Sequence, residues 1–217
     1  MLINLRYKFL FVHVAKTGGT SLRAGLKRLD WRDPFFPWRW LAGRISHGSG
    51  HRVACKLPRH AKIVAAHEML PREIFNSLYK FAFVRNPWDL QVSSFHHLRR
   101  ERPHLLAGCH DFYDFLRYKL DPDRPYQYHL DTTNDLQSDY LLGLHGELLV
   151  DFIGRYERLE EDFDALCRHL RLPAIRLEHR RQAKDRAADY RVYYSPEAAE
   201  LVARHWQADI ERFGYSF

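Results

Sequence analysis

Lys16 opens a short turn whose residue types suit the binding of an anion. Residues 9–22 read FLFVHVAKTGGTSL, so an apolar run of strand length ends just before the lysine and a stretch rich in glycine and hydroxyls follows. Glycines let the backbone approach a ligand closely, Thr and Ser hydroxyls donate hydrogen bonds, and lysine adds a point charge. The candidate anion-binding residues of this first turn are Lys16, Thr17, Gly18, Gly19, Thr20 and Ser21.

The order of these residues differs from the phosphate-binding loop of nucleoside triphosphatases, G-x-x-x-x-G-K-[ST]. Here the lysine precedes the glycines, and no clear acidic strand end that could hold Mg²⁺ follows. The structural alternative is a glycine-rich turn with an incidental lysine. The first turn taken alone therefore indicates an anion site without defining the ligand.

A second turn of similar chemistry follows later in the chain. Residues 81–95 read FAFVRNPWDLQVSSF, so Arg85 stands at the end of an apolar run and Ser93 follows about two helical turns later. A guanidinium can hold a phosphate through two parallel hydrogen bonds, and a serine on the next helix can reach the same oxygens. The alternative is that Arg85 caps sheet carbonyls and Ser93 is solvated. Two such turns together predict a ligand with anionic groups at both ends.

Both turns are expected at strand ends, because short apolar segments alternate with helical patterns along the chain. The expected strands cover residues 8–14, 62–66, 80–85 and 151–156. Helices are expected from Ser21 to about Leu29, from Pro87 to about Arg100, over residues 158–170, and from Ser195-Pro196 through Ile210. This alternation predicts an α/β fold with a central, mainly parallel sheet flanked by helices. Ligands of such sheets bind beyond the carboxyl ends of the strands.

Length and composition fit one folded domain over residues 1–217. No apolar run approaches the ~18 residues of a membrane-spanning helix. The first expected strand begins close to Met1 without a signal peptide, and the three cysteines are too scattered for a disulfide framework, so we expect a cytoplasmic protein. The net charge of +7 favours anionic partners, and no histidine or cysteine spacing matches a zinc site, so no metal is expected.

These motifs resemble those of sulfotransferases that use 3′-phosphoadenosine-5′-phosphosulfate (PAPS), in the branch with Golgi carbohydrate sulfotransferases and small bacterial enzymes. The resemblance spans nearly the whole chain, because residues 152–163 (FIGRYERLEEDF) and 209–217 (DIERFGYSF) also carry it. It implies a P-loop-like sulfotransferase fold and PAPS as the cofactor, without a metal. It also implies that residues 16–21 bind the 5′-phosphosulfate and that Arg85 and Ser93 bind the 3′-phosphate.

Sulfuryl transfer to a hydroxyl also needs a base for the acceptor proton and positive charge near the leaving phosphate. His67, at the end of the expected strand 62–66, is the predicted base, and relatives place a catalytic histidine in a comparable strand. Lys16 is expected to stabilise the bridging oxygen as the S–O bond breaks. Two alternatives remain open: Glu68 as the base, although neighbouring strand residues point to opposite faces, and a direct role for His13.

Two positions depart from the patterns of relatives. Ala65 stands where the cytosolic small-molecule enzymes carry a lysine, which points away from that branch and leaves more of the charge to Lys16. Leu90 stands where an arginine is common, so one supporting ion pair is missing.

Three further segments carry candidate roles with open alternatives. Residues 179–191 resemble a late loop that closes over the cofactor, or form a solvated charged run. Residues 134–140 have two interpretations: their polar side chains contact acceptor hydroxyls, or they form an ordinary polar turn. Residues 31–60 are an expected insertion whose aromatic and basic side chains contact the acceptor or a membrane surface, or simply pack on the core. The cations of the first segment are Arg180, Arg181, Lys184, Arg186 and Arg191.

We therefore predict a PAPS-dependent sulfotransferase that acts by in-line attack of an acceptor hydroxyl, on a carbohydrate or a glycolipid. A nucleotide kinase or triphosphatase is the first rival, disfavoured by the misplaced lysine and the missing Mg²⁺ ligands. A basic, non-catalytic nucleic-acid-binding protein is the second, disfavoured because the cations are scattered and no recognised module is present. The expected setting is a bacterial cytoplasm, or a longer protein from which an anchor has been removed.

Overall fold

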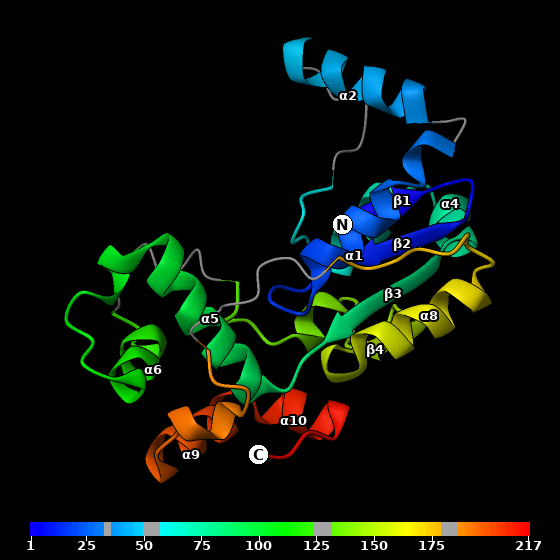
Figure 1. The fold of residues 1–217 in the computed structure, drawn as a ribbon. Helices are drawn as coiled ribbons and strands as arrows, with labels where there is room; N and C mark the ends of the chain where they lie inside the picture. The colour runs from blue at the N-terminus through cyan, green and yellow to red at the C-terminus, as the bar shows by residue number, and fades with distance from the viewer. Residues whose placement is uncertain (33–35, 50–56, 124–131, 179–185) are drawn as a thin grey trace. The chain divides into compact units, whose positions relative to one another are not determined.

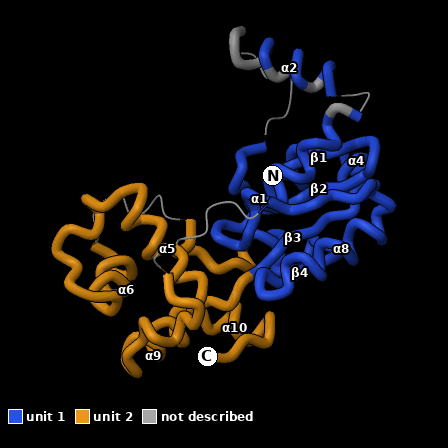
Figure 2. The backbone as a smooth tube through the Cα atoms, in the orientation of Figure 1, with its two compact units in different colours: residues 1–84, 140–180 blue, residues 85–139, 181–217 orange. Residues whose placement is uncertain are grey.

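The structure is a computed structural model that describes residues 1–32, 36–49, 57–123, 132–178 and 186–217. Within these ranges a four-stranded sheet has the strand order β1-β2-β3-β4 (Figure 1). The chain divides into two compact units, each made of two segments (Figure 2). Unit 1 comprises Met1–Val84 and Tyr140–Arg180, and unit 2 comprises Arg85–Asp139 and Arg181–Phe217.

Unit 1 contains the sheet, which confirms the predicted α/β fold with a mainly parallel sheet. β2 (Phe9–Val12), β3 (Tyr79–Val84) and β4 (Phe152–Arg155) are parallel neighbours, whereas β1 (Leu2–Asn4) is an antiparallel edge strand beside β2. The strands expected over residues 8–14, 80–85 and 151–156 are confirmed, and β1 is an addition to them. Because β2 and β3 run in parallel, both end at the same edge of the sheet.

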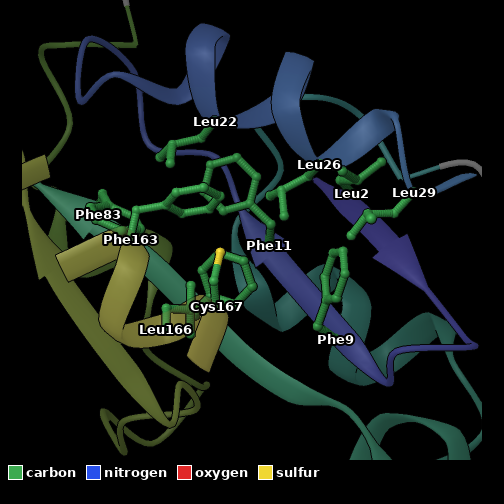
Figure 3. Close-up of a cluster of buried hydrophobic side chains, with 11 residues drawn as sticks. Leu2, Phe9, Phe11, Leu22, Leu26, Leu29, Phe83, Phe163, Leu166 and Cys167 are labelled. Atoms are coloured by element: carbon green, nitrogen blue, oxygen red, sulfur yellow. The ribbon is translucent and has the colours of Figure 1, made fainter. Parts of the chain in front are cut away.

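One face of the sheet is built from aromatic side chains and covered by α1 (Gly19–Lys27) and α8 (Leu159–His169). Phe9 and Phe11 of β2 and Phe81 and Phe83 of β3 stand at alternate positions, so each pair points to one face. The Phe11 and Phe81 rings stack with their centroids 5.3 Å apart. Figure 3 shows these strands packed against Leu22 and Leu26 of α1 and against Phe163 and Leu166 of α8.

The strand predicted over residues 62–66 is wrong, because this segment lies in α3 (Ile63–Met69), which α4 (Arg72–Ser77) follows. The buried residues of α3 are Ile63 and Ala66, which stand three positions apart on one face of a helix. A short apolar run carries too little periodicity to separate a strand from a helix. His67 therefore does not stand at the end of a strand.

Unit 2 is built from helices. α5 (Pro87–Glu101), α6 (Phe112–Leu120) and α9 (Pro196–His205) share a core that includes Trp88, Phe115 and Trp206. The helix expected from Pro87 to about Arg100 is confirmed. The expected single C-terminal helix is instead two helices, because the backbone leaves helical geometry at Trp206 (φ −105°, ψ 24°) before α10 (Gln207–Phe213).

The other helical elements in the described ranges are one long helix, α2, and several short 3₁₀ helices. They are α2 (Phe36–Ser49) and the 3₁₀ helices η1 (Asp30–Arg32), η2 (Pro103–Leu106), η3 (Ser138–Tyr140), η4 (Tyr156–Arg158) and η5 (Tyr190–Tyr193). None of the helices in the described ranges combines the length and the apolar character that crossing a bilayer requires.

Candidate functional site

The first predicted turn connects β2 to α1 in unit 1. Lys16 has a φ of 62° and Gly18 a φ of 77°, so the backbone is left-handed at both residues before α1 begins at Gly19. Thr17 is fully buried, and its hydroxyl donates a hydrogen bond to the carbonyl oxygen of Val14 at 3.0 Å. Among the described residues, no side chain caps α1, and its first turn has no acidic residue. The first N–H groups of α1 thus form a positive dipole end suited to an anion.

Close packing explains both glycines of this turn. A Cβ atom at Gly19 would lie 2.1 Å from ring atoms of His13, and a Cβ atom at Gly18 would lie 2.8 Å from the side chain of Leu159. Lys16 is half-buried and Ser21 is buried in the same loop. The structure therefore brings residues 16–21 together in one compact loop, with the ring of His13 packed directly against the start of α1.

His60, which the sequence did not single out, lies beside His13. The two rings are 4.5 Å apart between centroids, and Nδ1 of His60 lies 3.1 Å from the carbonyl oxygen of His13. Because a carbonyl oxygen only accepts, Nδ1 of His60 carries the proton and Nε2 is left as the proton acceptor. Burial, together with the neighbouring His60, lowers the pKa of His13 to about 2, and burial also lowers the pKa of His60. Both rings are therefore neutral at pH 7.

His67 is placed differently from the sequence expectation. It lies near the C-terminal end of α3, its side chain is 38% exposed, and its Nδ1 contacts Oε1 of Glu68 at 2.7 Å. The expectation that Glu68 points to the opposite face of a strand is wrong as well, because His67 and Glu68 both lie in α3. His67 as the base stays a prediction, now without the strand-end geometry that supported it.

The second predicted turn follows β3 and opens unit 2. Arg85 is 3% exposed, and the side-chain amide of Gln137 bonds both its backbone N–H and its carbonyl oxygen, at 2.9 and 2.8 Å. Asn86 caps α5 by accepting a hydrogen bond from the N–H of Trp88 at 3.0 Å, and Pro87 occupies the first helical turn. The backbone around Arg85 is therefore held on both sides.

Asp89, one turn into α5, joins two guanidinium groups. Its Oδ2 accepts a hydrogen bond from Nε of Arg85 at 2.6 Å, and its Oδ1 accepts one from Arg186. Burial and the charge of Arg85 lower the pKa of Arg186 from 12.5 to about 10, so Arg186 stays cationic at neutral pH. Nε of Arg186 is buried and has no hydrogen-bond partner among the described residues. Ser93 is four residues after Asp89, on the same face of α5.

A buried polar network supports this turn from behind. Asp209 of α10 is fully buried and accepts hydrogen bonds from the N–H groups of Gln137 (2.6 Å) and Ser138 (2.9 Å). Burial raises the pKa of Asp209, while the bonds from Ser138 and Gln137 act in the opposite direction. Gln137 and Ser138 are 3% and 2% exposed, so these two members of segment 134–140 are buried supports of the turn: Gln137 bonds Arg85, and Ser138 bonds Asp209.

Lys119 of α6 anchors the other side of α5. Its side chain is fully buried, and Nζ donates hydrogen bonds to Oε1 of Gln91 at 2.6 Å and to the hydroxyl of Thr133 at 2.5 Å. Sequence reasoning missed this residue, because a lysine in a helical pattern is normally placed on the surface. The contact fixes the helix that carries Ser93.

The cation-rich segment 179–191 is described only from Arg186 onward. Arg186 joins Asp89, whereas the side chain of Arg191 is 54% exposed and pairs with Asp189 at 3.4 Å. The other three cations of this segment, Arg180, Arg181 and Lys184, lie outside the described residues. In the part of the chain that the structure describes, no group of three or more His, Cys, Asp or Glu residues could hold a metal ion.

The first turn belongs to unit 1 and the second turn to unit 2. The first turn has N–H groups at a helix start, hydroxyls and one cation. The second turn has two cations beside Asp89 and the hydroxyl of Ser93 on the same helix. The fold and the two turns define a class of α/β proteins that carry candidate anion sites just after parallel strands.

Comparison with known proteins narrows this class. The profile of the sulfotransferase family matches residues 1–216, so the chain belongs to the sulfotransferase family. The chain is also similar to carbohydrate sulfotransferase 14 of Mus musculus, with 26% identity over 228 aligned residues that cover 94% of this chain and 53% of that protein. The chain thus spans about half the length of this curated relative. These matches confirm the resemblance inferred from the motifs.

Proposed function

We propose that this protein transfers the sulfuryl group of PAPS to a hydroxyl group of an acceptor. The observation that carries the proposal is the cluster of Arg85, Asp89 and Arg186, in which two guanidiniums share one carboxylate and leave an excess of positive charge. The buried Nε of Arg186 has no hydrogen-bond partner among the described residues, so a ligand oxygen is proposed as its acceptor. A 3′-phosphate, with Ser93 as a further donor, satisfies this cluster.

The first turn is proposed to hold the 5′ end of the same ligand. Gly18 and Gly19 allow the N–H groups at the start of α1 to approach an anion, Thr20 and Ser21 supply hydroxyls near it, and Lys16 supplies the charge. Thr17 is proposed to contribute through the backbone of the loop, because its buried hydroxyl is bonded to Val14. When bound, PAPS supplies a sulfuryl group on an activated phosphate. Lys16 then stabilises the negative charge that develops on the bridging oxygen as the acceptor oxygen bonds to sulfur and the S–O bond breaks.

Two histidines are candidates for the base that removes the acceptor proton. His67 is retained from the family pattern, with Glu68 orienting its ring. His60 has geometric support, because its Nδ1 faces the carbonyl oxygen of His13 and its Nε2 is the nitrogen able to take a proton beside the first turn. The variants His60→Gln and His67→Gln separate the two assignments. Loss of the base is expected to lower kcat by about 10²–10⁴ with unchanged affinity for adenosine 3′,5′-bisphosphate; a variant with full kcat eliminates its histidine.

A carbohydrate hydroxyl is the proposed class of acceptor. The named function of the mouse relative supports a carbohydrate, and the net charge of +7 suits an acidic glycan or the headgroup of a glycolipid. The proposed enzyme is a single sulfotransferase domain over residues 1–217, in which both turns serve one ligand. No role in nucleic-acid binding is proposed.

Ligand-induced stabilisation tests the proposed cofactor. Adenosine 3′,5′-bisphosphate at a hundred times its Kd is expected to stabilise the folded chain by about 2.7 kcal/mol, whereas AMP gives a smaller shift and ATP with Mg²⁺ gives little. Transfer of label from radiolabelled PAPS to a panel of glycans and glycolipids then tests the reaction. A shift with ATP and Mg²⁺ that exceeds the shift with the bisphosphate would overturn the proposal in favour of a kinase.

A further inference from the structure

The helix α2 concentrates exposed apolar side chains. Its fourteen residues include Trp38 (73% exposed), Trp40 (54%), Leu41 (44%) and Ile45 (46%), four of the ten large hydrophobic residues that are exposed in the described part of the chain. Single exposed hydrophobic residues need no explanation, whereas a group of them on one element marks a surface that binds something. α2 therefore differs from the other helices, whose large apolar side chains mostly point into the two cores.

Three of the exposed apolar side chains lie on one face of α2. Trp38, Leu41 and Ile45 follow the spacing i, i+3 and i+7, which places them on one face of an α-helix. In most helices of a folded domain this spacing faces the core. Here the three side chains are exposed, so the sequence pattern of a buried face is presented to the outside.

The charged residues that follow Asp33 in the sequence, through α2 and up to residue 67, have one sign. Residues 34–67 contain no aspartate or glutamate, and their cations are Arg39, Arg44, Arg52, Lys56, Arg59 and Lys62. Such a run attracts an anionic surface and repels a cationic one. An exposed apolar face within a wholly basic segment is the combination found in helices that lie at the interface of anionic membranes.

The chemistry of α2 favours lipid over a sugar chain. The guanidinium of Arg44 lies 5.0 Å from the ring centroid of Trp40, so it covers a ring face on which a sugar would stack. The helix FPWRWLAGRISHGS has no carboxylate or amide side chain to bond sugar hydroxyls, while Leu41 and Ile45 are aliphatic. At 1.5 Å per residue, fourteen residues span about 21 Å, which is less than the ~30 Å apolar core of a bilayer. A membrane-bound α2 would therefore lie on the surface and not cross it.

We propose that α2 binds the surface of an anionic lipid membrane, with Trp38, Leu41 and Ile45 entering the headgroup region and Arg44 on the same helix contacting lipid phosphates. This proposal goes beyond the sulfotransferase reaction and does not depend on it. It implies that the protein works next to a membrane, where hydroxyl-bearing headgroups are concentrated.

Vesicle co-sedimentation of the full chain tests the proposal. The wild-type chain is expected to bind vesicles of phosphatidylcholine with about one third phosphatidylserine at least tenfold more tightly than pure phosphatidylcholine, and to lose this preference at high salt. The triple variant Trp38→Ser, Leu41→Ser, Ile45→Ser is expected to lose about tenfold or more of that binding. The matched control is Leu144→Ser, which changes an exposed leucine (74% exposed) away from α2 and is expected to bind as the wild type does.

Two further measurements make the outcome decisive. If adenosine 3′,5′-bisphosphate stabilises the triple variant and the wild type equally, the variant is folded. If the proposed cofactor is wrong, equal melting temperatures of the two proteins without ligand show that the variant is folded. Equal binding of the wild type and the triple variant to anionic vesicles, or no binding of either, overturns the proposal. Binding to a soluble acidic polysaccharide that depends on the same three side chains, without binding to vesicles, overturns it in favour of a glycan site.

Discussion

The turn after β2 and the turn after β3 are held in different ways. The first is shaped by its own backbone: left-handed residues at Lys16 and Gly18, a glycine pressed against His13, and a threonine bonded within the loop. The second is held by side chains from elsewhere in unit 2, through Gln137 and Asp209. The shape of the first turn therefore comes from its backbone and from close packing. In the second, the cation is itself part of the structure.

The largest effect is expected at Arg85. Replacing this buried guanidinium by Met in Arg85→Met removes its charge-assisted hydrogen bond to Asp89, so we expect a loss of about 3 kcal/mol in the free energy of unfolding. Urea denaturation measures the loss, and the exposed Arg191→Met is the control, expected to change stability by less than about 0.5 kcal/mol. Equal stability of the two variants would show that the second turn does not depend on its cation.

The next largest effect is expected at Gly19. In Gly19→Ala the new methyl group would lie 2.1 Å from the ring of His13, and relief of this clash should lower the free energy of unfolding by about 2–3 kcal/mol. Gly143→Ala is the control, because its methyl group would meet only the flexible side chain of the exposed Glu147. If both alanines are tolerated equally, packing on His13 does not shape the first turn.

A pH-dependent loss of stability is expected from His13. Its pKa is lowered from 6.5 to about 2, so below pH 6.5 the unfolded chain binds a proton that the folded chain does not. This contribution is present above pH 6.5 and is lost as the pH falls, by about 2 kcal/mol between pH 7 and pH 5. Urea denaturation at both pH values should show a smaller loss in His13→Gln than in the wild type. An unchanged loss in His13→Gln would contradict a buried, neutral His13.

The smallest effect on stability is expected at Lys16. Glycine relieves the positive φ of this residue but has more freedom in the unfolded chain, so Lys16→Gly should change the free energy of unfolding by less than about 0.5 kcal/mol. Lys8→Gly is a matched control, because Lys8 also has a positive φ and lies in the turn between β1 and β2. We expect kcat/KM for PAPS to fall by about a hundredfold or more in Lys16→Gly only. Equal activity of both variants would remove Lys16 from the proposed mechanism.

The difference between the turn after β2 and the turn after β3 also explains which features could be predicted from the sequence. The strands β2 and β3 and the residues just after them are contiguous, so the strand pattern and the turn chemistry could be read together along the chain. The support of Arg85 comes from Gln137 and Asp209, far away in the sequence, and no local pattern connects them. The segment over residues 62–66 was too short for its periodicity to distinguish α3 from a strand.

Two other residues show the limits of local patterns. His60 precedes α3 in an irregular segment, and only the folded backbone brings its ring beside His13. Lys119 is buried because three polar side chains, Gln91, Ser94 and Thr133, surround its amine. Both placements depend on tertiary contacts, which outweigh the usual tendency of lysine and histidine to lie at or near the surface.

The central claim is that the two turns bind opposite ends of one ligand. Its most direct test is to measure the Kd values of 5′-AMP, 3′-AMP and adenosine 3′,5′-bisphosphate for the wild type, Lys16→Met and Arg186→Met by calorimetry. We expect Lys16→Met to weaken the binding of 5′-AMP and to leave that of 3′-AMP unchanged, and Arg186→Met to do the reverse. Each variant is expected to weaken the binding of the bisphosphate by about tenfold or more. Equal weakening of both monophosphates by each variant, or no weakening of the bisphosphate by either, would contradict it.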